Sequence, residues 1–133
     1  VGLLYIWFKK DINMKLEFKE NSLLIGDKEI NFYTKKIGSA YKFENIVIII
    51  FEGDYPQKDK NYNNAVALDF KSGILLWEIE LDDTIDYNNP YEDVSDAEAY
   101  FIFFKANSGK YAVNKLNGKI IRNIDLMSGN RPW

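Results

Sequence analysis

The feature that most constrains this chain is a hairpin pattern that occurs twice, 45 residues apart. Residues 64–80, NAVALDFKSGILLWEIE, alternate in hydropathy, turn at a glycine and continue as a second apolar run that contains a tryptophan. A shift of 45 residues places ALDFKSGILLWEIE over AVNKLNGKIIRNID, so that Gly73 meets Gly118. Period-two alternation is typical of β-strands, and repeated units bury their apolar faces by stacking on one another. We therefore expect a strand, loop and hairpin unit that is used twice.

The turn of the first copy has its own local chemistry. Asp69 is placed to accept hydrogen bonds from the turn amides near Ser72 and Gly73, and a glycine here can take the positive φ that such a turn needs. Trp77 follows on the returning strand, where it is either a core residue or a ligand-stacking residue, and the core position is the more common one. These residues make a hairpin and need no other role.

Strand patterns continue through most of the remaining sequence. Residues 22–33 predict a hairpin that turns at Gly26, and residues 45–51 form an apolar, β-branched run typical of a strand buried on both faces. The only helical signal is the capping-box spacing of Ser95 and Glu98, which supports one turn at most. The sequence predicts an all-β fold of about nine or ten antiparallel strands, arranged as stacked meander units or as a two-sheet sandwich.

Length and composition fit one domain. With 133 residues, 47% apolar and 16% aromatic, the chain can bury a core without disulfides or metals. We expect residues 14–133 to form this domain, and residues 1–13 to be either an additional edge strand or an extension that is not native. The apolar run that opens this segment is too short to span a bilayer, and its lysines follow the run instead of preceding it. We expect a cytoplasmic protein that does not enter a membrane.

Two absences restrict the chemistry. The chain has no cysteine and no histidine, which removes thiolate nucleophiles, Ser-His-Asp triads and most zinc, copper and haem sites. The carboxylates Asp82, Asp83 and Asp86 do not follow the spacing of a calcium-binding loop. Dispersed basic residues and a net charge of -3 argue against nucleic-acid binding. We expect a protein that is not an enzyme and that carries no cofactor and no metal.

Negative charge is concentrated in one segment. Between Glu78 and Glu98 there are nine acids and no lysine or arginine, and tyrosines lie among the acids. We expect a loop from Asp82 to Glu98. Such a loop fits the recognition of a basic protein surface, because its field speeds encounter and desolvated tyrosines supply anchoring energy. The other interpretation is a solvated loop that keeps the protein soluble. The residues predicted to contact a partner lie in this loop and in the polar loop after Phe51: Asp82, Asp83, Asp86, Tyr87, Tyr91, Glu92, Asp93, Asp96, Tyr55 and Tyr62.

Residues 67–77 match the pattern A-L-D-x-x-[ST]-G-x-x-x-W, which resembles the blade motif of bacterial quinoprotein-type β-propellers. The second copy departs from it, with Asn114 for the aspartate and Arg122 for the tryptophan. A closed propeller needs roughly four to eight blades, more than this chain supplies at its period. The resemblance therefore implies a hairpin with the same local structure, and it does not imply a quinone cofactor. It leaves open a second class of function, in which copies of the chain assemble into a structural or ligand-binding ring.

A longer resemblance covers residues 43–133. The stretches ENIVIII, NNAVALDFKSGILLWEIE, NNPY, YAVNKLNGKII and the terminal NRPW carry it. In these the chain resembles small bacterial proteins found beside polymorphic toxins, which act as immunity partners. The resemblance implies neutralisation of a cognate toxin by tight, non-catalytic binding. A nuclease toxin fits the acidic loop, because an active site that holds phosphate is basic, and we expect the free protein to be a monomer.

Overall fold

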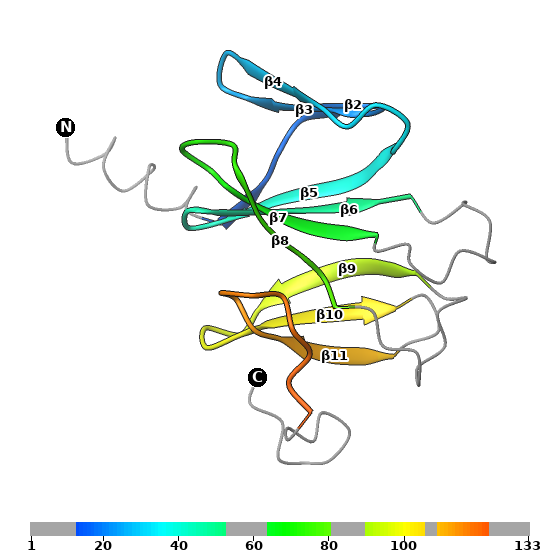
Figure 1. Cartoon of the computed structure of the whole chain (residues 1–133), viewed down its shortest axis with the longest axis vertical. Helices are drawn as coiled ribbons and strands as arrows, with labels where there is room; N and C mark the ends of the chain where they lie inside the picture. The colour runs from blue at the N-terminus through cyan, green and yellow to red at the C-terminus, as the bar shows by residue number, and fades with distance from the viewer. Residues whose placement is uncertain (1–12, 53–63, 81–89, 106–108, 123–133) are drawn as a thin grey trace.

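Antiparallel strands stack in three layers in the computed structural model of the chain (Figure 1). The structure describes residues 13–52, 64–80, 90–105 and 109–122. Within these ranges there are eleven strands and no helix, which confirms the all-β prediction. The helical turn predicted from Ser95 and Glu98 is wrong, because Ser95 lies on a strand and Glu98 has a left-handed φ of 68°.

A five-stranded central sheet separates two three-stranded sheets (Figure 1). The central sheet has the order β1 (Asn13–Lys15), β5 (Ile37–Phe43), β6 (Ile46–Phe51), β7 (Ala65–Asp69) and β8 (Leu75–Glu78). The N-terminal sheet has the order β2 (Phe18–Lys19), β3 (Ser22–Ile25) and β4 (Lys28–Asn31). The C-terminal sheet has the order β11 (Lys110–Val113), β10 (Phe101–Lys105) and β9 (Tyr91–Asp96). Strands adjacent in sequence are mostly adjacent in space, so the fold is one of stacked meanders.

Strand β6 contributes to two cores because both of its faces are buried, as the sequence predicts. Successive side chains of a strand point to opposite sides of the sheet. Val47 and Ile49 therefore pack toward the N-terminal sheet, in a cluster that includes strand β3. Ile48 and Ile50 pack toward the C-terminal sheet, in a cluster that includes Phe101. The central sheet is thus covered on both faces by apolar side chains.

The predicted repeat is visible in the backbone of the two hairpin turns. Gly73 donates its N–H to the Asp69 carbonyl at 2.7 Å, and Gly118 donates its N–H to the Asn114 carbonyl at 2.9 Å. The two glycines have φ values of 75° and 74°. The same turn closes both hairpins, although the second has an asparagine where the first has an aspartate.

Asp69 organises the first turn, as predicted. Its Oδ2 accepts hydrogen bonds from the backbone N–H and the hydroxyl of Ser72, both at 2.8 Å. Its Oδ1 accepts a hydrogen bond from Asn45 Nδ2 at 2.7 Å. Hydrogen bonds to a carboxylate favour its charged form. The Ser72 backbone N–H, with smaller contributions from the hydroxyl and Asn45, therefore lowers the pKa of Asp69.

Trp77 joins the two copies of the hairpin. Its side chain is 6% exposed, which confirms the predicted core position. The indole Nε1 donates a hydrogen bond to the Lys115 carbonyl at 2.8 Å. Gly118 lies so close to the ring that an added Cβ would stand 2.4 Å from Trp77 Cε3. The tryptophan of the first copy is therefore packed against the turn of the second.

Gly118→Ala should destabilise the protein more than Gly26→Ala. Both glycines have a positive φ, so each alanine carries a left-handed backbone penalty of about 1–2 kcal/mol. An alanine at 118 also overlaps the Trp77 ring, whereas an added Cβ at Gly26 has nothing within 4 Å. We expect G118A to lose about 1–3 kcal/mol more than G26A in urea unfolding. Equal losses in the two variants would contradict the close contact between Gly118 and Trp77.

The Asp69 turn should make stability depend on pH. Folding lowers the pKa of Asp69, so the charged carboxylate stabilises the folded protein. This contribution to the free energy of unfolding is fully present above the unfolded pKa of about 3.9, and it is lost as the pH falls through the lower folded pKa. Asp69→Asn should therefore lower the urea midpoint clearly at about pH 7 and less at about pH 2.5. A midpoint difference between wild type and variant that stays constant over this range would show that the charge of Asp69 is not what holds the turn.

Candidate functional site

The strand ends that border the predicted contact loops lie at one end of the molecule. Figure 1 shows the end of β6 and the starts of β7 and β9 on the same side of the molecule. Loops held by a rigid sheet are common positions for binding residues. Six of the predicted contact residues lie outside the described residues: Tyr55, Tyr62, Asp82, Asp83, Asp86 and Tyr87. The remaining four, which are Tyr91, Glu92, Asp93 and Asp96, all lie on strand β9.

Residues 91–96 form a strand, so the prediction of a continuous loop from Asp82 to Glu98 is wrong for this part. β9 pairs with β10 and is an edge of the C-terminal sheet. A register shift between Phe104 and Lys105 on β10 interrupts the regular alternation of β9. Glu92 and Asp93 are both exposed here, and we call these two carboxylates the acidic edge.

The acidic edge is tied to the central sheet through Asp93. Its Oδ1 accepts hydrogen bonds from the Tyr41 hydroxyl at 3.2 Å and from the Val94 N–H at 2.8 Å. Partial burial raises the pKa of Tyr41, against the opposing effect of its hydrogen bond with Ser39, and the charge of Asp93 adds to the rise. Tyr41 therefore stays protonated at neutral pH and keeps donating to Asp93. The carboxylate is held in place while it remains accessible.

Asp96 is engaged inside the protein instead of being available to a partner. Its Oδ1 lies 2.6 Å from Lys115 Nζ, and both side chains are mostly buried. The same oxygen accepts the Glu98 N–H at 2.9 Å. Asp96 therefore neutralises a lysine of the second hairpin and helps to shape the turn after β9.

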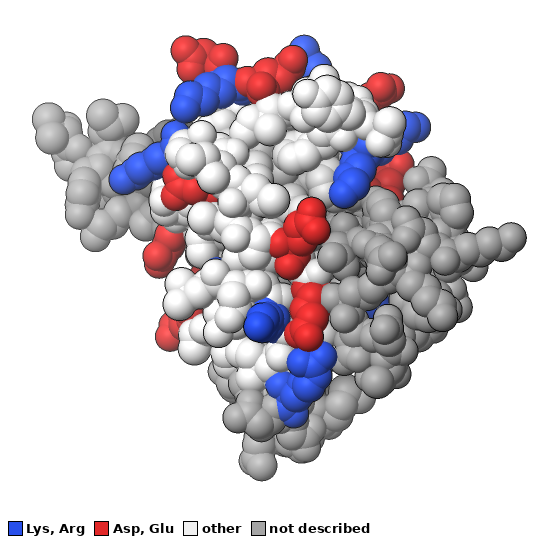
Figure 2. Space-filling model, in the orientation of Figure 1, with Lys and Arg blue, Asp and Glu red and all other residues white. Residues whose placement is uncertain are grey.

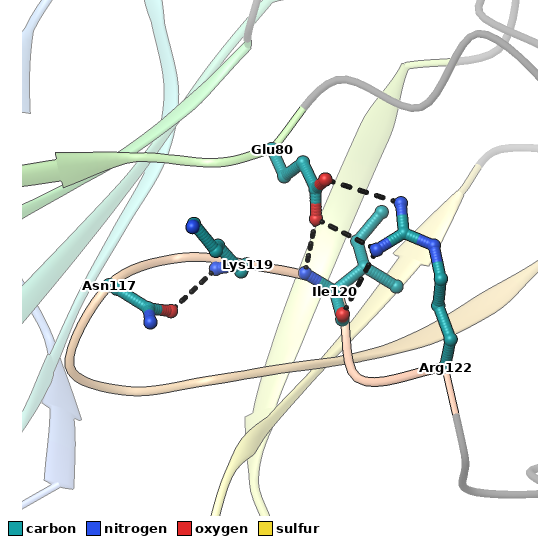
Figure 3. Close-up of polar contacts among 5 residues, drawn as sticks. All are labelled: Glu80, Asn117, Lys119, Ile120 and Arg122. Atoms are coloured by element: carbon teal, nitrogen blue, oxygen red, sulfur yellow. Dashed lines mark hydrogen bonds and ion pairs between the residues drawn. The ribbon is translucent and has the colours of Figure 1, made fainter.

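Glu80 is also neutralised within the protein, as Figure 3 shows. Its two carboxylate oxygens each lie 3.2 Å from a guanidinium nitrogen of Arg122. Its Oε1 also accepts the Ile120 N–H at 2.8 Å. Arg122 stands where the first copy of the repeat has Trp77, so the residue that breaks the motif has a specific structural partner. Two of the nine acids thus hold the second hairpin.

Tyr91 is a core residue, and its prediction as an exposed anchor is wrong. Only 8% of Tyr91 is exposed. Its ring centroid lies 5.5 Å from that of Phe103 and 6.0 Å from that of Tyr111, in edge-to-face contacts. The Nζ atom of Lys105 lies 4.9 Å from the same centroid, a cation–π distance. Tyr91 therefore stabilises the sheet that presents the acidic edge.

Asn64 is a structural residue that sequence reasoning missed. It is buried immediately before β7, and its side-chain amide makes two hydrogen bonds with the backbone of Tyr91. Asn64 Nδ2 donates to the Tyr91 carbonyl at 2.6 Å, and the Tyr91 N–H donates to Asn64 Oδ1 at 3.1 Å. Asn64 Nδ2 also lies 3.3 Å from the Phe51 carbonyl. This side chain joins the central sheet to the first residue of β9.

The described surface around the acidic edge offers electrostatic recognition. Within the described ranges, neither Glu92 nor Asp93 forms an ion pair, and no group of three or more carboxylates is placed to hold a metal ion. The face drawn in Figure 2 carries acids and bases interspersed. No helix in the described part is long and apolar enough to cross a membrane. Exposed carboxylates on a fixed strand can accept hydrogen bonds from lysine or arginine.

A family model described as "Domain of unknown function (DUF7957)" matches residues 13–124. This range includes all eleven described strands and the turns of both hairpins. Searches of curated proteins and of solved structures found no match.

Asn64→Ala should weaken the connection between the central sheet and the C-terminal sheet. The substitution leaves the Tyr91 N–H and carbonyl without their buried partner, and each such group costs about 1–3 kcal/mol. As a control, Asn117→Ala removes an exposed side chain that accepts only the Lys119 N–H of its own turn. We expect N64A to lose several times more unfolding free energy than N117A in urea titrations. Similar losses would mean that the bridge contributes nothing beyond a turn contact.

Proposed function

We propose, from the premise that the chain belongs to the DUF7957 family, that it is a non-catalytic protein-binding module. In this proposal the acidic edge contacts a basic surface on another protein. The family description assigns no function, so support comes from the residues themselves.

The observation that carries the proposal is the contrast among the acids of one segment. Glu80 and Asp96 form ion pairs with residues of the second hairpin. Glu92 and Asp93, in contrast, are exposed and make no ion pair among the described residues. Carboxylates on a strand lose little conformational freedom on binding, and their field speeds encounter with a basic partner. The buried Tyr91 beneath them keeps the strand in place.

A second explanation for these charges is protective. Charged side chains on an edge strand prevent its pairing with strands of other molecules. This explanation predicts that reversing the charges changes nothing as long as the edge stays charged. The binding proposal predicts that the sign of the charge matters.

The more specific form of the proposal is that the protein is a cytoplasmic immunity protein. Its support is the resemblance of residues 43–133 to immunity partners of polymorphic toxins, together with the acidic segment from Glu78 to Glu98. The expected partner is a toxin with a basic surface, such as a nuclease whose active site holds phosphate. Binding there would exclude substrate from the toxin without any reaction by the immunity protein.

The proposal is tested with the product of the adjacent gene. We expect tight binding in calorimetry and protection of cells that express both proteins. Glu92→Lys combined with Asp93→Lys should weaken binding about 10–100-fold at low ionic strength, mainly through a slower association rate.

The matched control carries the same change of net charge on another sheet. Glu17 and Glu29 are exposed near the N-terminal sheet, and Glu17→Lys combined with Glu29→Lys should leave binding almost unchanged. Thermal unfolding of both double variants shows that they are folded. Failure of the adjacent gene product to bind would overturn the immunity proposal, and equal binding by the two double variants would overturn the role of the acidic edge.

A further inference from the structure

The turn of the second hairpin contains an asparagine that is followed directly by a glycine. Asn117–Gly118 is the one Asn-Gly pair in the sequence. Glycine has no side chain to obstruct its own backbone nitrogen, so in an open chain this nitrogen can reach the side-chain amide carbon of the preceding asparagine. An Asn-Gly pair is therefore the dipeptide in which an asparagine most readily loses its side-chain amide. The pair lies outside the acidic edge.

The reaction at such a pair needs only water and hydroxide. Hydroxide takes the proton of the Gly118 backbone nitrogen, and this nitrogen attacks Cγ of Asn117. A new C–N bond closes a cyclic imide, and the side-chain nitrogen takes a proton from water and leaves as ammonia. Water then opens the imide at either carbonyl, which gives an aspartate or an isoaspartate. No oxidant or reductant takes part, and the isoaspartate adds a methylene group to the backbone.

The electrophile of this reaction is in place in the folded protein. Asn117 is exposed in the turn. Its Oδ1 accepts a hydrogen bond from the Lys119 N–H at 2.9 Å, as Figure 3 shows. A donor at this oxygen stabilises the negative charge that develops there when a nucleophile attacks Cγ. The side chain of Asn117 is thus accessible to water and polarised for attack.

The nucleophile, in contrast, is withheld. Gly118 is buried, and its N–H donates to the Asn114 carbonyl at 2.9 Å. Its carbonyl accepts the Glu80 N–H, also at 2.9 Å. The Trp77 ring covers the glycine so closely that an added Cβ would stand 2.4 Å from Cε3. A buried and hydrogen-bonded amide exchanges its proton with solvent only when the structure opens locally, and the attack on Cγ needs the same step.

We propose that Asn117 is a site of spontaneous deamidation, that the contacts of Gly118 suppress the reaction in the folded protein, and that opening of the second hairpin turn starts it. The isoaspartate product makes the opening irreversible, because its longer backbone does not fit a turn that is packed against Trp77. The aspartate product keeps an acceptor for the Lys119 N–H and fits the same turn.

The test follows conversion of Asn117 in the full chain at mildly alkaline pH, by peptide mapping that separates aspartate from isoaspartate. The folded protein should convert at least about 10-fold more slowly than the same chain unfolded in urea. Trp77→Phe removes the donor to the Lys115 carbonyl and part of the ring over Gly118, so it should speed conversion about 3–10-fold in the absence of urea. The matched control is Asn64→Ala, which weakens a different junction and should speed conversion less.

Hydrogen exchange tests the cause of the suppression. Across the wild type and both variants, the rate of conversion should follow the exchange rate of the Gly118 N–H, whether or not a variant is fully folded. Rates that do not follow this exchange would overturn the role of Gly118. Equal rates in the folded and the urea-unfolded chain would overturn the suppression by folding, and an unfolded chain that keeps Asn117 intact would overturn the site.

The products test the consequence of the reaction. Asn117→Asp should unfold thermally at nearly the wild-type temperature, because the aspartate fits the turn. The isoaspartate form, separated by chromatography from protein that was converted in urea and refolded, should unfold at a clearly lower temperature. An isoaspartate form as stable as the wild type would overturn the irreversible opening.

Discussion

The fold depends on the contact between Trp77 and the turn of the second hairpin. An indole buries 150–250 Å² or so when it enters a core, and its N–H needs a partner there. Gly118 provides room for the ring and the Lys115 carbonyl accepts its N–H, so one residue of the first hairpin fixes two features of the second. The ion pair of Glu80 and Arg122 closes the same junction from outside. The C-terminal sheet is therefore attached to the central sheet at a point set by the repeat.

Local patterns predicted the parts of the fold that are made locally. The alternation on either side of Gly73, the carboxylate of Asp69 at the turn and the core position of Trp77 all follow from residues close together in the sequence. The order of the layers does not follow from residues close together in the sequence. Asn64 ends a polar stretch, and nothing in that stretch indicates that its amide will meet the backbone of Tyr91, 27 residues later. Such non-local pairing of polar groups is set only when the sheets pack.

The sequence predicts the charge of the candidate site but not its geometry. A count of acids locates the acidic segment, but it cannot tell which carboxylates form ion pairs with Arg122 and Lys115, because those partners lie 42 and 19 residues away. Tyr91 was misread for a different reason. The irregular pairing opposite Lys105 adds a residue to β9, so its buried positions do not recur at every second residue. A bulged strand that carries acids lacks the regular alternation of a strand, so its sequence resembles that of a polar loop.

The acidic edge is held in place by contacts from the rest of the fold. β9 lies beside β5 and β6 of the central sheet, and Tyr41 of β5 donates a hydrogen bond to Asp93. Asn64 holds the first residue of β9 through two hydrogen bonds to its backbone, and the Tyr91 side chain is buried in the core. Because these contacts are made within the protein, the geometry of the acidic edge is set before any partner arrives.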